Sequence, residues 1–135
     1  MKKTVFIIAV LFSVTAFSQP PVQTSNTVVG KEAKAQIKFE NTVIDFGKIK
    51  KDVPVEKEFT FTNTGNAPLI ISSAHASCGC TTPVAPKDPI APGQTGTIKA
   101  GFNARNVGHF SKPITVTSNA DESSVIVTIT GEVVE

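Results

Sequence analysis

Tryptophan and tyrosine are absent from this 135-residue chain, methionine occurs once, and Arg105 is the only arginine. A single arginine cannot form the paired guanidinium clamp that often holds phosphate groups. The 13 basic residues are nearly balanced by 11 acidic ones. Surfaces that bind nucleic acid or anionic membranes need clustered basic side chains. The composition therefore argues against nucleic acid as a partner.

Long apolar runs are also lacking. Residues 5–12 are apolar throughout, but a membrane span needs about 20 such residues. The run follows Lys2 and Lys3 and precedes small residues that end at Ser18, which is the order of a secretory signal peptide. No cysteine stands at the cleavage position, as a lipoprotein anchor would require. We predict that residues 1–18 are a signal peptide and that the mature protein is periplasmic or secreted.

Removal of this segment takes away Lys2 and Lys3, so 11 basic and 11 acidic residues remain. The mature chain is then close to neutral. Residues 19–35 are mostly polar, begin with Gln-Pro-Pro and show no apolar period. We expect them to form a flexible tether. Residues 36–135 have a length typical of one domain.

The domain region alternates apolar with polar residues, which is the period of β-strands, and shows no helical period. Six or seven short strands in about 100 residues predict an all-β fold, an immunoglobulin-like antiparallel β-sandwich of about seven strands. The tryptophan, tyrosine and widely spaced cysteine pair of true antibody domains are missing. Phenylalanine and aliphatic side chains must therefore fill the core. The expected strands lie within residues 36–40, 43–47, 55–63, 69–74, 97–102, 114–117 and 125–133.

Turn residues separate several of these strands. Asn63, Gly65 and Asn66 lie between two apolar runs, and we expect Gly65 to adopt a positive φ there. Pro92 and Gly93 predict a second turn before the strand at 97–102.

Several motifs follow one another along the domain. Together they resemble the bacterial domain-of-unknown-function family 1573, which is grouped with immunoglobulin-like domains related to the ciliary Hydin and sperm-protein modules. The resemblance covers residues 39–134 and implies a β-sandwich and an exported bacterial protein. It implies no catalytic residues, because the family defines none. The motifs are residues 46–49 (Phe-Gly-Lys-Ile), 59–66 (Phe-Thr-Phe-Thr-Asn-Thr-Gly-Asn), 68–71 (Pro-Leu-Ile-Ile), 77–81 (Ser-Cys-Gly-Cys-Thr) and 90–94 (Ile-Ala-Pro-Gly-Gln).

Cys78 and Cys80 are the only cysteines and flank Gly79, which can bend the chain. Export brings thiols into oxidising conditions, and a turn at Gly79 brings two such sulfurs within bonding reach. Three interpretations stay open: a structural staple or two buried thiols, a redox-active dithiol, and a soft-metal site for Cu(I) or zinc. We expect a disulfide at one end of the sandwich that is easily reduced.

His75 and His109 are the only histidines and the only candidates for further soft-metal ligands. His75 lies three residues before Cys78. In an immunoglobulin sandwich the end of the strand at 69–74 faces the start of the strand near His109, which would bring His109 close to the cysteines. Pro113 argues against this pairing, because proline interrupts a central strand. The ordinary interpretation of each histidine is a surface or turn residue.

The sequence shows no paired acid and base at catalytic spacing and no nucleophile elbow. We therefore expect no enzymatic activity and no cofactor. The favoured interpretation is an exported, non-catalytic domain that binds another protein or a cell-envelope component through a surface or a strand edge. The alternative is a small thiol protein that uses Cys78, Gly79 and Cys80 for disulfide exchange or soft-metal binding.

Overall fold

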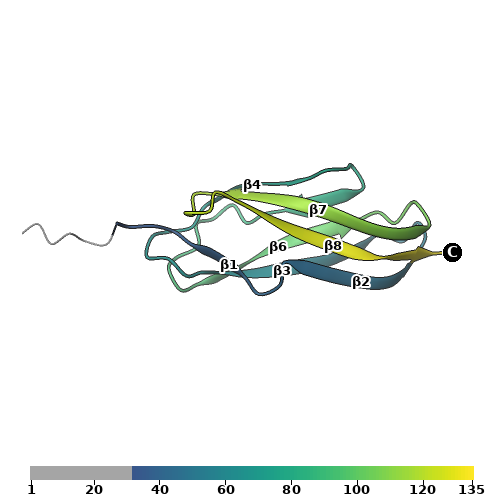
Figure 1. Ribbon diagram of the computed structural model, residues 1–135, viewed down its shortest axis with the longest axis horizontal. Coiled ribbons are helices and arrows are strands. Elements are labelled where there is room, and N and C mark those ends of the chain that lie inside the picture. Colours follow the sequence, from purple (N-terminus) through teal and green to yellow (C-terminus); the bar gives the residue numbers. More distant parts are fainter. Residues whose placement is uncertain (1–31) are drawn as a thin grey trace, which may run out of the picture.

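The computed structural model describes residues 32–135, which form eight strands and no helix (Figure 1). The predicted signal peptide and most of the predicted tether lie outside the described residues. In the part that is described, no helix has the length and apolar character of a membrane span. The strands are β1 (Ile37–Phe39), β2 (Val43–Lys50), β3 (Val55–Asn63), β4 (Ile71–Ala76), β5 (Thr81–Val84), β6 (Thr95–Phe102), β7 (Gly108–Ser118) and β8 (Ser124–Val134).

These strands form two four-stranded sheets, in the orders β1-β3-β6-β5 and β2-β8-β7-β4, which lie as two layers (Figure 1). The predicted all-β sandwich is confirmed, with eight strands instead of about seven. One pairing departs from the antiparallel pattern, because β2 runs parallel to β8. In the other sheet, β1 pairs antiparallel with β3. The chain changes sheets at Asn41 and Thr42, where the apolar alternation of the sequence is interrupted.

The hydrophobic core lies between the two sheets. Phe59 and Phe61 of β3 and Ile98 of β6 are almost completely buried, and they face Ile114 of β7 and Ile129 of β8. Each side chain of this size contributes about 1.5–3 kcal/mol when it is removed from water. The prediction of a phenylalanine and aliphatic core is therefore confirmed.

The predicted turn after β3 is organised by Asn63, which is completely buried. Its side-chain Nδ2 donates to the carbonyl oxygens of Ala67 (2.7 Å) and Ile90 (2.9 Å), and its Oδ1 accepts from the amide of Gly65 (3.0 Å). The amide of Gly93, in the second predicted turn, donates to the backbone oxygen of Asn63 (2.8 Å). One buried amide thus joins both turns, and its polar atoms are satisfied as burial requires.

Gly65 does not adopt the positive φ that we predicted; among the described glycines this region is occupied by Gly47, Gly93 and Gly108. Glycine is required at position 65 for a different reason. A Cβ there would lie 2.6 Å from the amide nitrogen of Gln36 and still closer to the carbonyl oxygen of Lys34. The turn is therefore a site of close backbone approach.

The approaching backbone belongs to the segment that precedes β1. Asn66 accepts from the amide of Lys34 through its Oδ1 (2.7 Å) and donates its own amide to the carbonyl oxygen of Lys34 (2.9 Å). Ala35 is 3% exposed and forms an isolated parallel bridge with Ala120. The folded domain therefore begins before the predicted boundary at Gln36, because Lys34 and Ala35 are held by it.

Candidate functional site

The cysteine pair lies in the turn that carries the chain from β4 in one sheet to β5 in the other. Cys78 and Cys80 form a disulfide, with their Cα atoms 5.3 Å apart. This separation is within the usual range for disulfides. Both residues are half-buried and Gly79 between them is exposed, so the pair sits at the surface of the domain.

Thr81, the first residue of β5, places a hydroxyl group beside the disulfide. Its Oγ1 lies 3.8 Å from the sulfur of Cys78 and 3.8 Å from the sulfur of Cys80, and Thr81 is only 5% exposed. The turn is also held by the backbone. The amide of Thr81 donates to the Cys78 carbonyl (3.4 Å), and the amide of Asn103 donates to the Cys80 carbonyl (3.0 Å).

Neither histidine joins the cysteines. His75 is exposed on β4 opposite Thr115, and His109 is exposed on β7 opposite Glu132. The end of β4 pairs with Ile114, five residues beyond His109, which differs from the expected register. In residues 32–135 no three or more histidine, cysteine, aspartate or glutamate side chains come together as a metal site. The side chains of the described region thus do not assemble the soft-metal site considered from the sequence.

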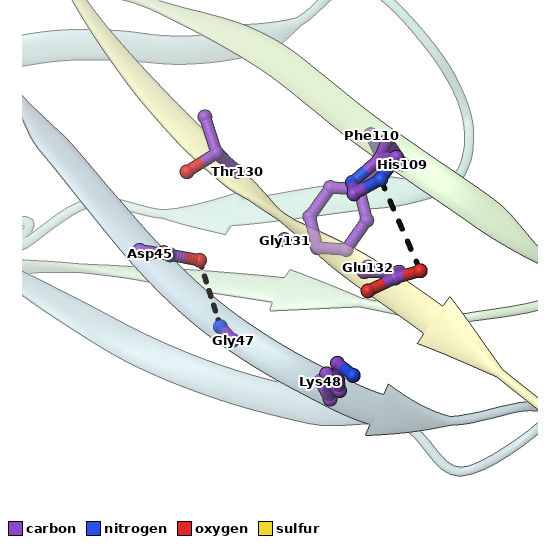
Figure 2. Close-up of a pocket in the computed structure, with 8 residues that line it drawn as sticks. All are labelled: Asp45, Gly47, Lys48, His109, Phe110, Thr130, Gly131 and Glu132. Atoms are coloured by element: carbon purple, nitrogen blue, oxygen red, sulfur yellow. Dashed lines mark hydrogen bonds and ion pairs between the residues drawn. The ribbon is translucent and has the colours of Figure 1, made fainter.

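A hollow of about 370 Å³ lies where β2, β8 and β7 run side by side. Figure 2 shows its lining, with Asp45, Gly47 and Lys48 on β2 facing Gly131 and the ring of Phe110. The register of β2 shifts between Asp45 and Lys48, as in a β-bulge. The Asp45 carboxylate accepts from the amide of Gly47 (2.7 Å), which has a φ of 68°.

Gly131 lets the Phe110 ring and β2 approach closely beside this hollow, because a Cβ there would lie 2.7 Å from the Phe110 ring and 2.9 Å from the carbonyl oxygen of Gly47. No site was predicted at Gly131 from the sequence, although a glycine inside a strand often marks a bulge or a close approach. His109 Nε2 and Glu132 Oε1 at the rim are 3.9 Å apart (Figure 2). This distance exceeds a hydrogen bond, so the carboxylate does not orient the imidazole as acid–base catalysis requires.

The third feature is an open edge on β7. This strand has 11 residues, but β4 pairs only with its C-terminal part, from Ile114 to Ser118. Within the described residues no strand pairs with residues 108–113 on that side. We call this stretch the open edge of β7. Pro113 lies in it and is paired with Thr128 of β8, so the predicted interruption of the strand at proline is wrong.

The free backbone groups of the open edge follow from the register. Thr128 donates its amide to Thr42 on the β2 side (2.7 Å), so the pair Pro113–Thr128 is not a hydrogen-bonded pair of the β7–β8 ladder. Alternation along β7 then points the backbone groups of His109 and Ser111 away from β8 as well. Pro113 tolerates this position because its missing N–H would face the unpaired side.

Bonds on both sides of the sheet agree with this alternation. The carbonyl of Val134 accepts from the amide of Lys51 on the β2 side (2.8 Å). Val134 lies six residues after Thr128, so the backbone groups of both residues point to the same side of β8. The carbonyl of Thr117 accepts from the hydroxyl of Ser72 on β4 (3.0 Å). Thr117 lies six residues after Ser111, so the backbone groups of both residues point away from β8. The open edge thus presents the N–H and C=O groups of His109 and Ser111, together with the C=O of Pro113.

Residues 37–133 match the family described as "Protein of unknown function (DUF1573)". The chain belongs to this family. The resemblance of the sequence motifs to domain-of-unknown-function family 1573 is thereby confirmed. No curated protein matches the chain in sequence.

Solved structures show where else this fold of the DUF1573 chain occurs. A protein of unknown function from Porphyromonas gingivalis W83 has a TM-score of 0.66 and 15% identity, over 78% of this chain and 51% of that one. The ASH/PapD-like domain 7 of human CEP192 has a TM-score of 0.60 and 12% identity, over 96% and 98%. The YadV chaperone has a TM-score of 0.56 and 16% identity, over 74% and 53%.

The DUF1573 chain therefore corresponds to about half of the Porphyromonas protein. At these identities the likeness shows a shared fold alone.

Proposed function

We propose that this protein is an exported, non-catalytic binding domain that accepts an extended segment of a partner protein at the open edge of β7. One observation carries the proposal: β7 continues for six residues, Gly108 to Pro113, beyond its pairing with β4. Unpaired strand edges are templates for pairing with another chain. Export rests on the predicted signal peptide of residues 1–18.

The bonding pattern limits how the partner segment would bind. Two N–H and three C=O groups face outward along the edge, from His109, Ser111 and Pro113. Pro113 lacks an N–H, which ends the donor row next to the last pair with β4. An added strand would therefore pair over about five residues, between the β6–β7 loop and Ile114, where the last residue of β4 pairs with β7.

Side chains on the added strand would alternate between the two faces of the sheet. Phe110 is half-buried and stacks on Phe102, with ring centroids 4.1 Å apart. Its position just inside the open edge favours an apolar side chain on the inward face of the partner segment. Backbone bonds would supply affinity, and this contact would supply selectivity.

The proposal is tested with a matched pair of variants, Ser111→Pro and Ser111→Ala. Both remove the hydroxyl, but only proline removes the amide that faces the open edge. Peptides selected from a random library against the parent protein should bind Ser111→Ala with unchanged affinity and Ser111→Pro about fivefold more weakly, given about 1 kcal/mol for the one hydrogen bond lost. Equal affinity for the two folded variants would place recognition elsewhere on the domain.

A further inference from the structure

We infer that the turn at Cys78 and Cys80 is a thiol–disulfide exchange site whose substrate is a pair of thiols in another protein. This exchange oxidises one substrate per chain without turnover, so it adds to the proposed non-catalytic binding at the open edge of β7, and it uses other residues. The first observation is access: the turn leaves the sheet at the end of β4, Gly79 at its tip is exposed, and both cysteines are half-buried. An attacking thiolate must reach a sulfur atom, and exposed disulfides are the labile and catalytic ones.

The two sulfurs are not equivalent. Cys80 is one of the half-buried residues that pack against the hydrophobic core, and Cys78 is not. We therefore assign the attack to the sulfur of Cys78, whose side chain is not held against the core. Attack there makes Cys80 the leaving group, and exchange is faster when the leaving thiolate is stabilised.

Thr81 supplies that stabilisation. Its hydroxyl is 3.8 Å from each sulfur, and the only hydrogen-bond partners of this hydroxyl in the described region are these two atoms. A neutral disulfide accepts such a bond weakly, whereas a thiolate accepts it strongly because charge-assisted hydrogen bonds are stronger than neutral ones. The near-complete burial of Thr81 keeps water from competing for the hydroxyl.

The backbone would hold the opened turn in place. The bonds from Thr81 to the Cys78 carbonyl and from Asn103 to the Cys80 carbonyl do not involve the sulfur atoms. The ring closed by the disulfide spans only three residues. Opening it therefore frees little chain, and the two thiols stay close enough to form the bond again.

The exchange balances in two steps. A thiolate of the partner attacks the sulfur of Cys78; the bond between Cys78 and Cys80 breaks, and its electron pair leaves on Cys80 as a thiolate. A mixed disulfide now joins Cys78 to the partner. The second thiolate of the partner attacks the partner's sulfur in this mixed disulfide and releases Cys78 as a thiolate. The partner is oxidised to a disulfide, and Cys78 and Cys80 gain two electrons and then take up two protons.

The test uses a synthetic peptide with two reduced cysteines as the probe, with mass spectrometry of protein and peptide over time. We expect one probe molecule to be oxidised per protein chain, at least tenfold faster than by the free cyclic peptide of residues 76–82. That control contains the same ring and the same threonine without the fold. A rate no higher than that of the free peptide would overturn the assignment.

Thr81→Val and Thr81→Ser form the matched pair for the hydroxyl. Thr81→Val should oxidise the probe about tenfold more slowly, and Thr81→Ser should keep the parent rate; equal rates for both would remove Thr81 from the step. Single variants test the asymmetry: Cys80→Ser should form a mixed disulfide with oxidised probe at Cys78, and Cys78→Ser should form it at least tenfold more slowly. Two free thiols, or a bound metal ion, in freshly isolated protein would overturn the exchange function.

Discussion

At the scale of single residues, Asn63 and Gly65 decide how the end of β3 meets the neighbouring segments. Asn63 looked like a turn residue in the sequence and proves to be a buried connector of two turns and the β1 segment. Gly65 lies in the predicted turn, but without the predicted positive φ. Glycine is required there because a Cβ would clash with the neighbouring backbone. Local chemistry identified both positions, and the contacts that explain them come from distant parts of the chain.

Gly65→Ala and Gly79→Ala are a matched pair that tests this explanation. At position 65 the new Cβ would meet the backbone of Lys34 and Gln36, so we expect a loss of about 1–3 kcal/mol in the free energy of unfolding. At position 79 a Cβ would have no neighbour within 4 Å, and we expect a change within about 0.5 kcal/mol. Urea denaturation of both variants measures the difference. Equal stability of the two variants would contradict the close-approach explanation.

At the scale of elements, β7 differs most from its prediction, because the expected strand at residues 114–117 proves to run from Gly108 to Ser118. The proline at position 113 suggested an interruption, yet the strand runs from Gly108 to Ser118 and pairs with β8 along ten of its residues. It tolerates proline because β4 ends opposite Ile114. The same mismatch in strand length leaves the open edge, so one arrangement explains both the proline and the proposed binding site.

Proline substitutions at neighbouring positions test this register. Ser111→Pro removes an amide that faces the open edge, and we expect it to change the free energy of unfolding by less than about 1 kcal/mol. Lys112→Pro removes an amide that bonds to β8, and we expect a loss of about 3 kcal/mol or more. In the parent protein, the amides of His109 and Ser111 should exchange with deuterium quickly, while those of Phe110 and Lys112 should be protected. Protection of Ser111 equal to that of Lys112 would refute the assigned alternation.

At the scale of the whole molecule, we expect the fold to depend on the core between the sheets and not on its disulfide. The ring formed by Cys78 and Cys80 spans only three residues. Such a small ring restricts the unfolded chain little. Phe59, Phe61 and Ile98, by contrast, are almost completely removed from solvent.

The double variant Cys78→Ser/Cys80→Ser should therefore fold and lose no more than about 2 kcal/mol of stability. Phe61→Ala is the contrasting core variant and should lose about 3–5 kcal/mol. Thermal unfolding of both variants beside the parent gives the comparison. If the cysteine variant failed to fold while Phe61→Ala folded, the disulfide would be a structural staple, and the exchange function would lose its physical basis.

Most of the sandwich was predictable because the signals for a strand, apolar alternation and flanking turn residues, lie within a few neighbouring residues. The alternation in residues 55–63 and 125–133 and the turn residues near Asn63 and Gly93 identified strands close to their observed bounds. The change of sheet at Asn41 and Thr42 was visible only as an interrupted pattern. A parallel pairing between β2 and β8 joins opposite ends of the chain, and no local signal specifies it.

The sequence by itself determined the fold class, the family, the phenylalanine core and the closeness of Cys78 to Cys80, because periodicity, composition and short spacing act over a few residues. The tertiary structure alone decided where β4 stops along β7, that His109 faces Glu132, and that the Thr81 hydroxyl lies beside both sulfurs. These features depend on strand register across the sheets. Register is set by the packing of the whole core, and a shift of two residues would keep every local pattern while moving each of these contacts.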